Sequence, residues 1–164
     1  NNVLKLVDNR AFNIHPSLLP SYKGCSSVTW ALVNGEKKYG FSYHLISKKI
    51  DSGKIIYQKA LDLEKFDLQY TAYYRVMFES LKPFNKIFNS IVKRKFNIIS
   101  SKTKASYYKR GAPFNGIIDE KWSVDFIKKF IKSMIFPPKK NAIFKRSEVN
   151  NFASYLKLKN ERKN

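Results

Sequence analysis

Cysteine, histidine and acidic residues are scarce in this chain of 164 residues. The single cysteine, Cys25, excludes an internal disulfide and fits a reducing compartment, so we expect a cytoplasmic protein. One cysteine and two histidines offer no cluster of metal ligands, so we expect chemistry without a metal ion. The chain has no run of about 20 apolar residues and no apolar N-terminal segment, so we expect neither a membrane span nor a signal peptide.

The charge is strongly one-sided, with 32 Lys and Arg against 12 Asp and Glu and a net charge of +20. Such an excess attracts nucleic acid, phosphorylated sugars or an anionic membrane surface. The lysines, however, are scattered along every segment instead of massing on one. This distribution favours a general compositional bias over a dedicated nucleic-acid-binding surface, and both interpretations stay open.

The remaining composition is that of a globular protein. Hydrophobic residues make up 43% of the chain and aromatic residues 15%, which suits a packed core and not a disordered segment. A chain of this length can bury about 68–70% of its unfolded surface as one domain.

The most informative segment is residues 12–24, which read FNIHPSLLPSYKG. Residues i and i+2 of a strand point to the same face, so Asn13 and His15 project side by side. Pro16 biases His15 toward extended geometry, so a strand over residues 11–15 should end in a loop directly after the imidazole. Polar side chains at such a strand end mark the usual site of an open α/β sheet.

This polar pair suits acyl-type transfer to an amine. An amide N–H of Asn13 can donate to the oxyanion of a tetrahedral intermediate, and His15 can relay a proton near neutral pH. Asp51 meets His15 if a strand over residues 41–47 lies beside residues 11–15, and its carboxylate then orients the ring. Taken alone, N-x-H is more often an ordinary strand end, and the sequence IDSG at 50–53 is more often a simple turn.

Taken together, these segments resemble the formyltetrahydrofolate-dependent formyltransferases. The resemblance rests on residues 12–24, on WALVNGEK at 30–37 and on IDSGKII at 50–56, in this order. It implies that Asn13, His15 and Asp51 are the catalytic residues and that 10-formyltetrahydrofolate is the formyl donor. The family's S-L-L-P-x-x-x-G loop implies folate contacts at Ser17, Leu18, Leu19, Pro20 and Gly24.

A second match concerns the acceptor. Residues 117–123, the amphipathic helix after them and FPP at 136–138 are similar to the segment that follows the core in methionyl-tRNA and sugar N-formyltransferases. The sequence YKRGAP at 108–113 looks closest to the sugar type. The resemblance therefore implies formyl transfer to a small-molecule primary amine, first that of a nucleotide-linked amino sugar, with methionyl-tRNA as the alternative. A homodimer stays open as well.

The family's core has several strands and helices before the N-x-H strand, whereas about a dozen residues precede it here. We therefore expect the C-terminal part of a Rossmann-like α/β core, with a short mixed sheet, flanking helices and a helical extension. An inactive or partner-dependent fragment is the third hypothesis. The expected regions are a catalytic core at 1–100, a linker and helix at 101–139, and a basic tail at 140–164.

Local patterns predict the other elements. Strands over 40–47 and 55–61 should form an antiparallel hairpin whose turn holds Asp51, and Ser26 or Ser27 should cap a short helix that ends at Val33. His44 lies on the first of these strands, and we expect a structural role for it. A short strand should follow at 96–99.

Two longer helices are also predicted. Asp67 should cap the first helix, and Pro83 should kink it. The apolar face of this helix is predicted to consist of Met77, Leu81, Phe84, Phe88 and Ile91. The second should begin after Ser123 and bury Ile127, Phe130, Ile131 and Met134.

Overall fold

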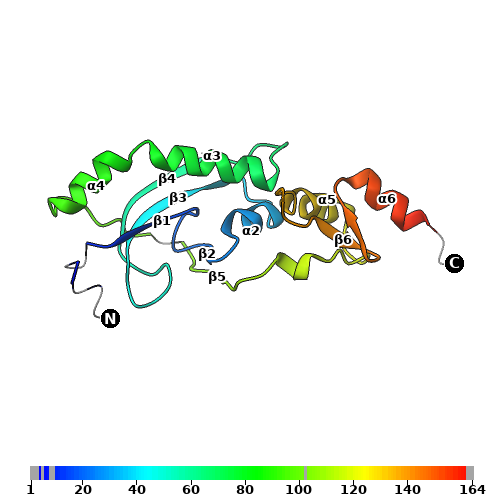
Figure 1. Cartoon of the computed structure of the whole chain (residues 1–164), viewed down its shortest axis with the longest axis horizontal. Helices are drawn as coiled ribbons and strands as arrows, with labels where there is room; N and C mark the ends of the chain where they lie inside the picture. The colour runs from blue at the N-terminus through cyan, green and yellow to red at the C-terminus, as the bar shows by residue number, and fades with distance from the viewer. Residues whose placement is uncertain (1–3, 5, 8–9, 102, 162–164) are drawn as a thin grey trace.

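The computed structural model describes residues 4, 6–7, 10–101 and 103–161. A three-stranded sheet with two long helices occupies one end of the molecule, and a second small core occupies the other (Figure 1). None of the helices in the described ranges is long and apolar enough to cross a bilayer. In chain order the elements are β1 (Phe12–His15), β2 (Lys23–Gly24), α2 (Ser27–Val33), β3 (Lys38–Leu45), β4 (Ile55–Asp62), α3 (Gln69–Leu81), α4 (Phe84–Val92), β5 (Tyr107–Tyr108), the helical turn η1 (Pro113–Gly116), α5 (Val124–Ser133), β6 (Ala142–Phe144), β7 (Ser147–Val149) and α6 (Phe152–Asn160).

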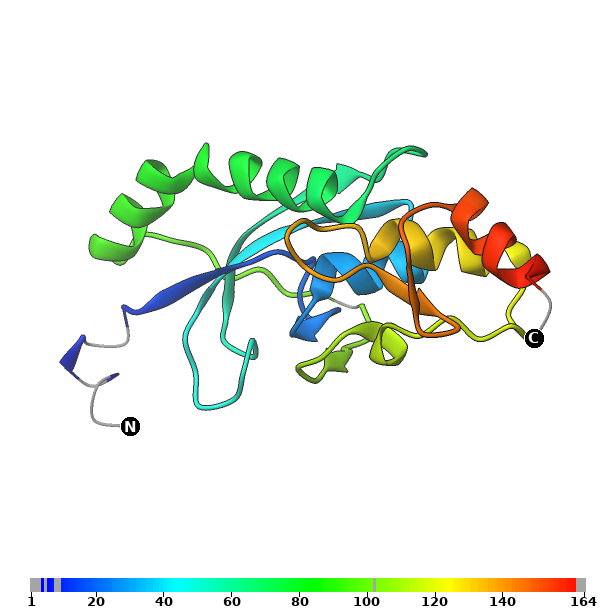
Figure 2. The same ribbon diagram turned by 45° about the vertical axis from the view of Figure 1, so that its right-hand side comes forward.

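The main sheet has the order β1-β3-β4, and both strand pairs are antiparallel. This arrangement confirms the predicted hairpin, the predicted neighbour of β1 and the α/β class. Asn13 pairs with His44 and His15 with Ser42, so polar side chains of two adjacent strands face one another across the register. The loop over residues 46–54 joins β3 to β4 and holds Asp51 (Figure 2).

The first core lies between this sheet and helices α2, α3 and α4. Phe41 and Tyr43 of β3 are fully buried there, and Val76 supplies the facing side of α3. Two tyrosine hydroxyls of β3 donate to backbone carbonyls of α3: Tyr39 to Ala72 at 2.9 Å, and Tyr43 to Ser80. These hydrogen bonds satisfy buried hydroxyls and fix the helix along the sheet.

The predicted apolar stripe is partly wrong. Pro83 separates two helices, α3 and α4, so the apolar spacing does not continue from one helix into the next. The buried positions are Val76 in α3 and Ile87 and Ile91 in α4. Three residues of the predicted stripe are instead exposed: Leu81 by 57%, Phe84 by 36% and Phe88 by 44%. In Figure 1, α3 and α4 follow one another on the same side of the main sheet.

Three predictions of local detail are also wrong. Asp67 does not cap α3, because its carboxylate accepts instead from Arg75 and from the Glu64 N–H. Ser26 stands at the N-cap of α2, which ends at Val33 as predicted, but neither serine side chain caps the helix: Ser27 Oγ donates to the Pro16 carbonyl, and Ser26 Oγ donates to that of Gly111. The expected strand at 96–99 is a single bridge from Ile99 to Ile55.

The second core is built by α5, the β6–β7 hairpin and α6. Ser123 caps α5 through a hydrogen bond from the Phe126 N–H, and the predicted inward residues of this helix are buried. The described part of residues 140–164, expected as a basic tail, instead forms β6, β7 and α6, because Val149 and Tyr155 are buried against α5. The division into regions at residues 100 and 139 stays a prediction.

Gly53 is the residue of the β3–β4 loop that tolerates no side chain. A Cβ there would lie 1.6 Å from the carbonyl oxygen of Leu45. Gly53→Ala should therefore displace the loop and lower the free energy of unfolding by about 1–3 kcal/mol, as measured by urea denaturation. The exposed neighbour offers a control, Lys54→Ala, which should change it by less than about 0.5 kcal/mol. Equal midpoints for the two variants would contradict this account of the loop.

Candidate active site

The loop after β3 brings Asp51 to the end of β1. His15 Nδ1 lies 3.5 Å from Asp51 Oδ2, and the two side chains are only 7% and 11% exposed. The backbone N–H of Gly24 donates to the same carboxylate oxygen at 2.8 Å. The structure thus brings together the imidazole and the carboxylate that the sequence placed 36 positions apart (51 − 15).

His44 adds a second imidazole to this cluster. Its Nδ1 donates to the Leu45 carbonyl at 3.0 Å, and its Nε2 lies 3.3 Å from the Asn13 amide nitrogen and 3.5 Å from Asp51 Oδ1. Burial lowers the pKa of His44, while the Leu45 carbonyl and Asp51 act in the opposite direction. A neutral His44 with Nδ1–H accepts the Asn13 N–H at Nε2, which fixes the orientation of the amide.

Sequence reasoning gave His44 only a structural role. The signal that it contacts Asn13 was nevertheless available in part, because the two residues pair directly once β1 and β3 are aligned. The orientation of the His44 ring could not be predicted from the sequence. The ring is held by a hydrogen bond to the Leu45 carbonyl, and the β3–β4 register shifts between Tyr43 and His44.

The loop after β1 holds the other nitrogen of His15. His15 Nε2 donates to the carbonyl of Tyr22 at 2.8 Å. The Tyr22 ring stacks on Tyr108 at 5.5 Å, and its hydroxyl donates to Glu36 at 2.5 Å. Burial, together with the Glu36 carboxylate, raises the pKa of Tyr22, so its hydroxyl stays protonated at neutral pH.

The residues expected to contact folate lie in this same loop, and most of them support the fold. Ser42 Oγ donates to the Ser17 carbonyl at 2.7 Å and accepts the Leu19 N–H at 3.1 Å. Ser17 and Leu19 are buried, and Leu18 and Pro20 are half-buried. Gly24 is the one of the five that lines the cavity beside His15. The folate contacts stay a prediction.

Two hollows adjoin the cluster. His15 lines a cavity of about 570 Å³ together with Gln69, Tyr73 and Phe136. Asn13, His44 and Asp51 line a separate hollow of about 230 Å³, whose other residues come from the β3–β4 loop. Among the residues that the structure describes, no group of three or more His, Cys, Asp or Glu could hold a metal ion.

A family model described as formyl transferase matches residues 1–84. The chain belongs to the formyl transferase family. The resemblance drawn from the sequence motifs is thereby confirmed.

Individual members of this formyl transferase family cover most of the chain. This chain is 36% identical to the GDP-perosamine N-formyltransferase of Brucella melitensis over 142 residues. The aligned region covers 87% of this chain and 54% of that protein. The crystal structure of WlaRD, a sugar 3N-formyltransferase in the presence of dTDP and 5-N-formyl-THF, is 27% identical with a TM-score of 0.77, over 87% of this chain and 53% of that one.

A third member shows the shared fold. The N-formyltransferase of Helicobacter canadensis, in complex with folinic acid and dTDP-3-aminofucose, has a TM-score of 0.78 at 24% identity, over 87% of this chain and 54% of that one. The chain thus spans about half the length of the relatives named here.

The lowered pKa of His44 has a measurable effect on stability. The unfolded chain binds a proton near pH 6.5, whereas folded His44 binds it only at lower pH, so its contribution to folding is present above about pH 6.5 and is lost as the pH falls. The free energy of unfolding of His44→Gln should therefore decrease less between about pH 7 and about pH 5 than that of the unaltered chain. Ser47→Ala is the control, and it should keep the original pH dependence. Identical slopes in all three proteins would exclude this role of His44.

Proposed function

We propose that this chain is the catalytic part of an enzyme that transfers a formyl group from 10-formyltetrahydrofolate to the primary amine of a nucleotide-linked amino sugar. The observation that carries the proposal is the contact of His15 with Asp51 at 3.5 Å, with Asn13 joined to the same carboxylate through His44. Membership of the formyl transferase family supports the reaction, and the relatives' nucleotide sugars support the acceptor. Activity is proposed for the whole protein, because the chain spans about half of its relatives.

The reaction begins when the neutral amine attacks the formyl carbon and a C–N bond forms. The electron pair of the carbonyl moves to oxygen, and an amide N–H of Asn13 donates to this oxyanion. His15 takes the proton from the new ammonium group and returns it to N10 of the folate as the C–N10 bond breaks. The oxyanion then reforms the carbonyl, and the products are a formamide and tetrahydrofolate.

Asp51 keeps His15 ready for this proton relay. Once the acceptor amine has displaced the Tyr22 carbonyl, to which Nε2 now donates, an Nδ1–H donated to Asp51 leaves Nε2 as the basic atom, and the carboxylate stabilises the imidazolium after proton uptake. The Gly24 N–H, which donates to Asp51 Oδ2, holds the carboxylate in place. The acceptor amine would replace the Tyr22 carbonyl, the present partner of Nε2 at 2.8 Å.

The two hollows suggest how the substrates approach. The donor would enter through the hollow lined by Asn13 and Asp51, whose rim includes Lys48 and Lys49. These lysines suit the carboxylates of the folate tail. The acceptor would enter through the larger cavity that His15 lines.

The role assignment can be tested in the full-length protein with 10-formyltetrahydrofolate and a GDP-linked amino sugar. His15→Ala should lower kcat by about 10²–10⁴-fold, and Asn13→Ala by about 10²–10³-fold, because the oxyanion loses its donor. Asp51→Ala should also lower kcat, since the ring loses its orienting partner. Lys93→Ala, an exposed position at the end of α4, is the control with unchanged kcat. Full activity in His15→Ala or Asp51→Ala would refute the assignment.

A half-enzyme that needs a partner is the second candidate. Within the described residues, β3 is the only strand that pairs with β1, so the other edge of β1 is open.

Methionyl-tRNA stays the alternative acceptor, and the net charge of +20 is the observation that favours it.

Folinic acid can separate a self-sufficient donor site from a partner-dependent one. A ligand at 100 times its Kd stabilises the folded state by about 2.7 kcal/mol, so a donor site present in this chain should raise its thermal midpoint. We expect an increase with folinic acid, and a smaller one in Asn13→Ala. A cooperative transition that folinic acid leaves unchanged would favour the partner-dependent half-enzyme.

A further inference from the structure

The backbone carbonyl of Tyr22 occupies the nitrogen at which the proposed reaction needs the amine. His15 Nε2 donates to this partly buried carbonyl at 2.8 Å. An amine that takes its place at Nε2 therefore lies directly beside the displaced carbonyl. A carbonyl shielded from water needs a new hydrogen-bond donor when it loses its old one, and the amine itself brings that donor.

A primary amine carries two N–H groups and one lone pair. When one N–H is donated to His15 Nε2 and the other to the Tyr22 carbonyl, the lone pair is left to point at the formyl carbon. Two acceptors thus hold the nucleophile in the orientation of attack, and such orientation lowers the barrier of a transfer reaction. With one acceptor alone, the amine would be free to rotate about its single hydrogen bond.

Contacts with three other segments fix the position of the Tyr22 carbonyl. The backbone of Tyr22 is left-handed, with a φ of 59°, which is uncommon for a residue with a side chain and is held here by its surroundings. Its N–H donates to Ser106 Oγ at 2.7 Å, and its ring stacks on Tyr108 at an angle of 11°. Its hydroxyl donates to Glu36 Oε1 at 2.5 Å and accepts a side-chain N–H of Asn34 at 3.0 Å.

Glu36 is the member of this set that can be altered with the least disturbance of the fold. Its side chain is exposed, and it lines neither the cavity of His15 nor the hollow of Asp51. It belongs to the motif WALVNGEK at 30–37, in which the proposed reaction gives no residue a role. A change at Glu36 therefore reaches the catalytic residues through Tyr22.

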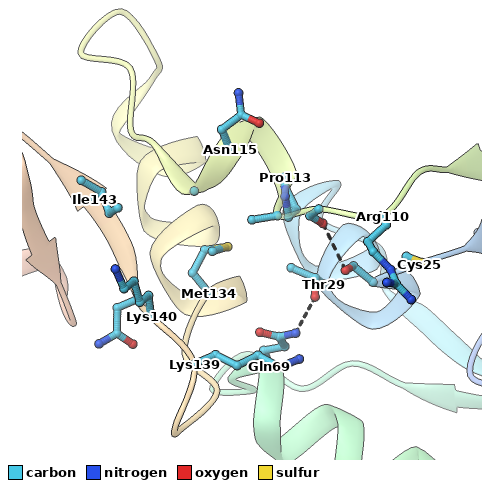
Figure 3. Close-up of a pocket in the computed structure, with 15 residues that line it drawn as sticks. Cys25, Thr29, Gln69, Arg110, Pro113, Asn115, Met134, Lys139, Lys140 and Ile143 are labelled. Carbon is cyan, nitrogen blue, oxygen red and sulfur yellow. Dashed lines mark hydrogen bonds between the residues drawn. The ribbon is translucent and has the colours of Figure 1, made fainter.

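The segment after Tyr22 borders the side from which the acceptor is proposed to arrive. Gly24 lines the cavity of His15, and Cys25 lines a neighbouring cavity of about 510 Å³, which Figure 3 shows. The two cavities share Thr29 and Gln69, which are hydrogen-bonded to one another at 2.6 Å. Tyr22 thus stands within three positions of residues that line both cavities.

We propose that the Tyr22 carbonyl binds the second N–H of the acceptor amine and that Glu36 is a positioning residue, which holds this carbonyl through the Tyr22 hydroxyl. The inference rests on the proposed function and adds a specificity to it. The site prefers a primary amine to a secondary one, because only the primary amine satisfies both acceptors. Both groups act through hydrogen bonds, so the bonds that form and break are those already described.

The test compares a GDP-linked primary amino sugar with its N-methyl derivative, in the full-length protein with 10-formyltetrahydrofolate. The primary amine should have a kcat/KM at least about 100-fold higher. Glu36→Ala and Tyr22→Phe should each lower kcat/KM for the primary amine by about tenfold and reduce this ratio, because the carbonyl is held less firmly. The KM of the folate donor should change less than about twofold, since the donor does not contact this link.

Three further variants separate positioning from a general structural effect. Glu36→Gln keeps an acceptor oxygen and should recover most of the loss seen in Glu36→Ala. Glu120→Ala, which removes another exposed carboxylate, is the matched control and should leave kcat/KM and the ratio unchanged. The double variant Tyr22→Phe/Glu36→Ala should lose no more than the larger single variant, because both changes break one link.

Three results would overturn the proposal. Equal kcat/KM values for the two amines in the unaltered protein would exclude the second hydrogen bond. An amine ratio that Glu36→Ala leaves intact, or an equal loss in Glu120→Ala, would exclude the positioning role. Additive losses in the double variant would show two independent structural effects, and circular dichroism checks that each variant is folded.

Failure of this contact can be told apart from failure of the proposed reaction. Loss of activity in His15→Ala, together with equal kcat/KM values for the two amines, would overturn the contact and leave the reaction standing. An amine ratio that depends on Glu36, in a protein whose activity survives His15→Ala, would leave the contact standing and overturn the proposed reaction.

Discussion

The carboxylate of Asp51 is the contact on which the arrangement of the candidate site depends. It accepts the Gly24 N–H at 2.8 Å and lies 3.5 Å from the imidazole of His15 and 3.5 Å from that of His44. One buried group therefore joins the end of β1, the loop after it and the body of β3. Because an unpaired buried carboxylate is strongly disfavoured, this contact constrains the β3–β4 loop as well as the chemistry.

Much of this arrangement followed from local sequence rules. The alternation around Asn13 and His15, the break at Pro16 and the turn signals around Asp51 predicted the strands and the β3–β4 hairpin. The capping role of Ser123 and the buried face of α5 were also predicted. These features depend on neighbours within a few positions of the chain, which is why periodicity and turn chemistry were enough.

The features that were missed depend on tertiary contacts. Asp67 looked like a helix cap, but Arg75, in the second turn of α3, competes for its carboxylate. The segment 140–164 looked like a tail because its lysines dominate the composition, although Val149 and Tyr155 pack against a helix that only the fold supplies. The orientation of His44 likewise depends on a backbone carbonyl and a register shift, neither of which has a sequence signature.

The aromatic rings beside the site loop form a chain between the two cores. Tyr22 stacks on Tyr108, Tyr108 stacks on Trp30 at 4.4 Å, and Trp30 meets Phe114 at 5.6 Å. Phe114 in turn lies 4.9 Å from Trp122, the second tryptophan of the protein. Both indoles thus belong to one continuous series of ring contacts. The intrinsic tryptophan fluorescence of the protein should therefore respond to changes in how the two cores pack against one another.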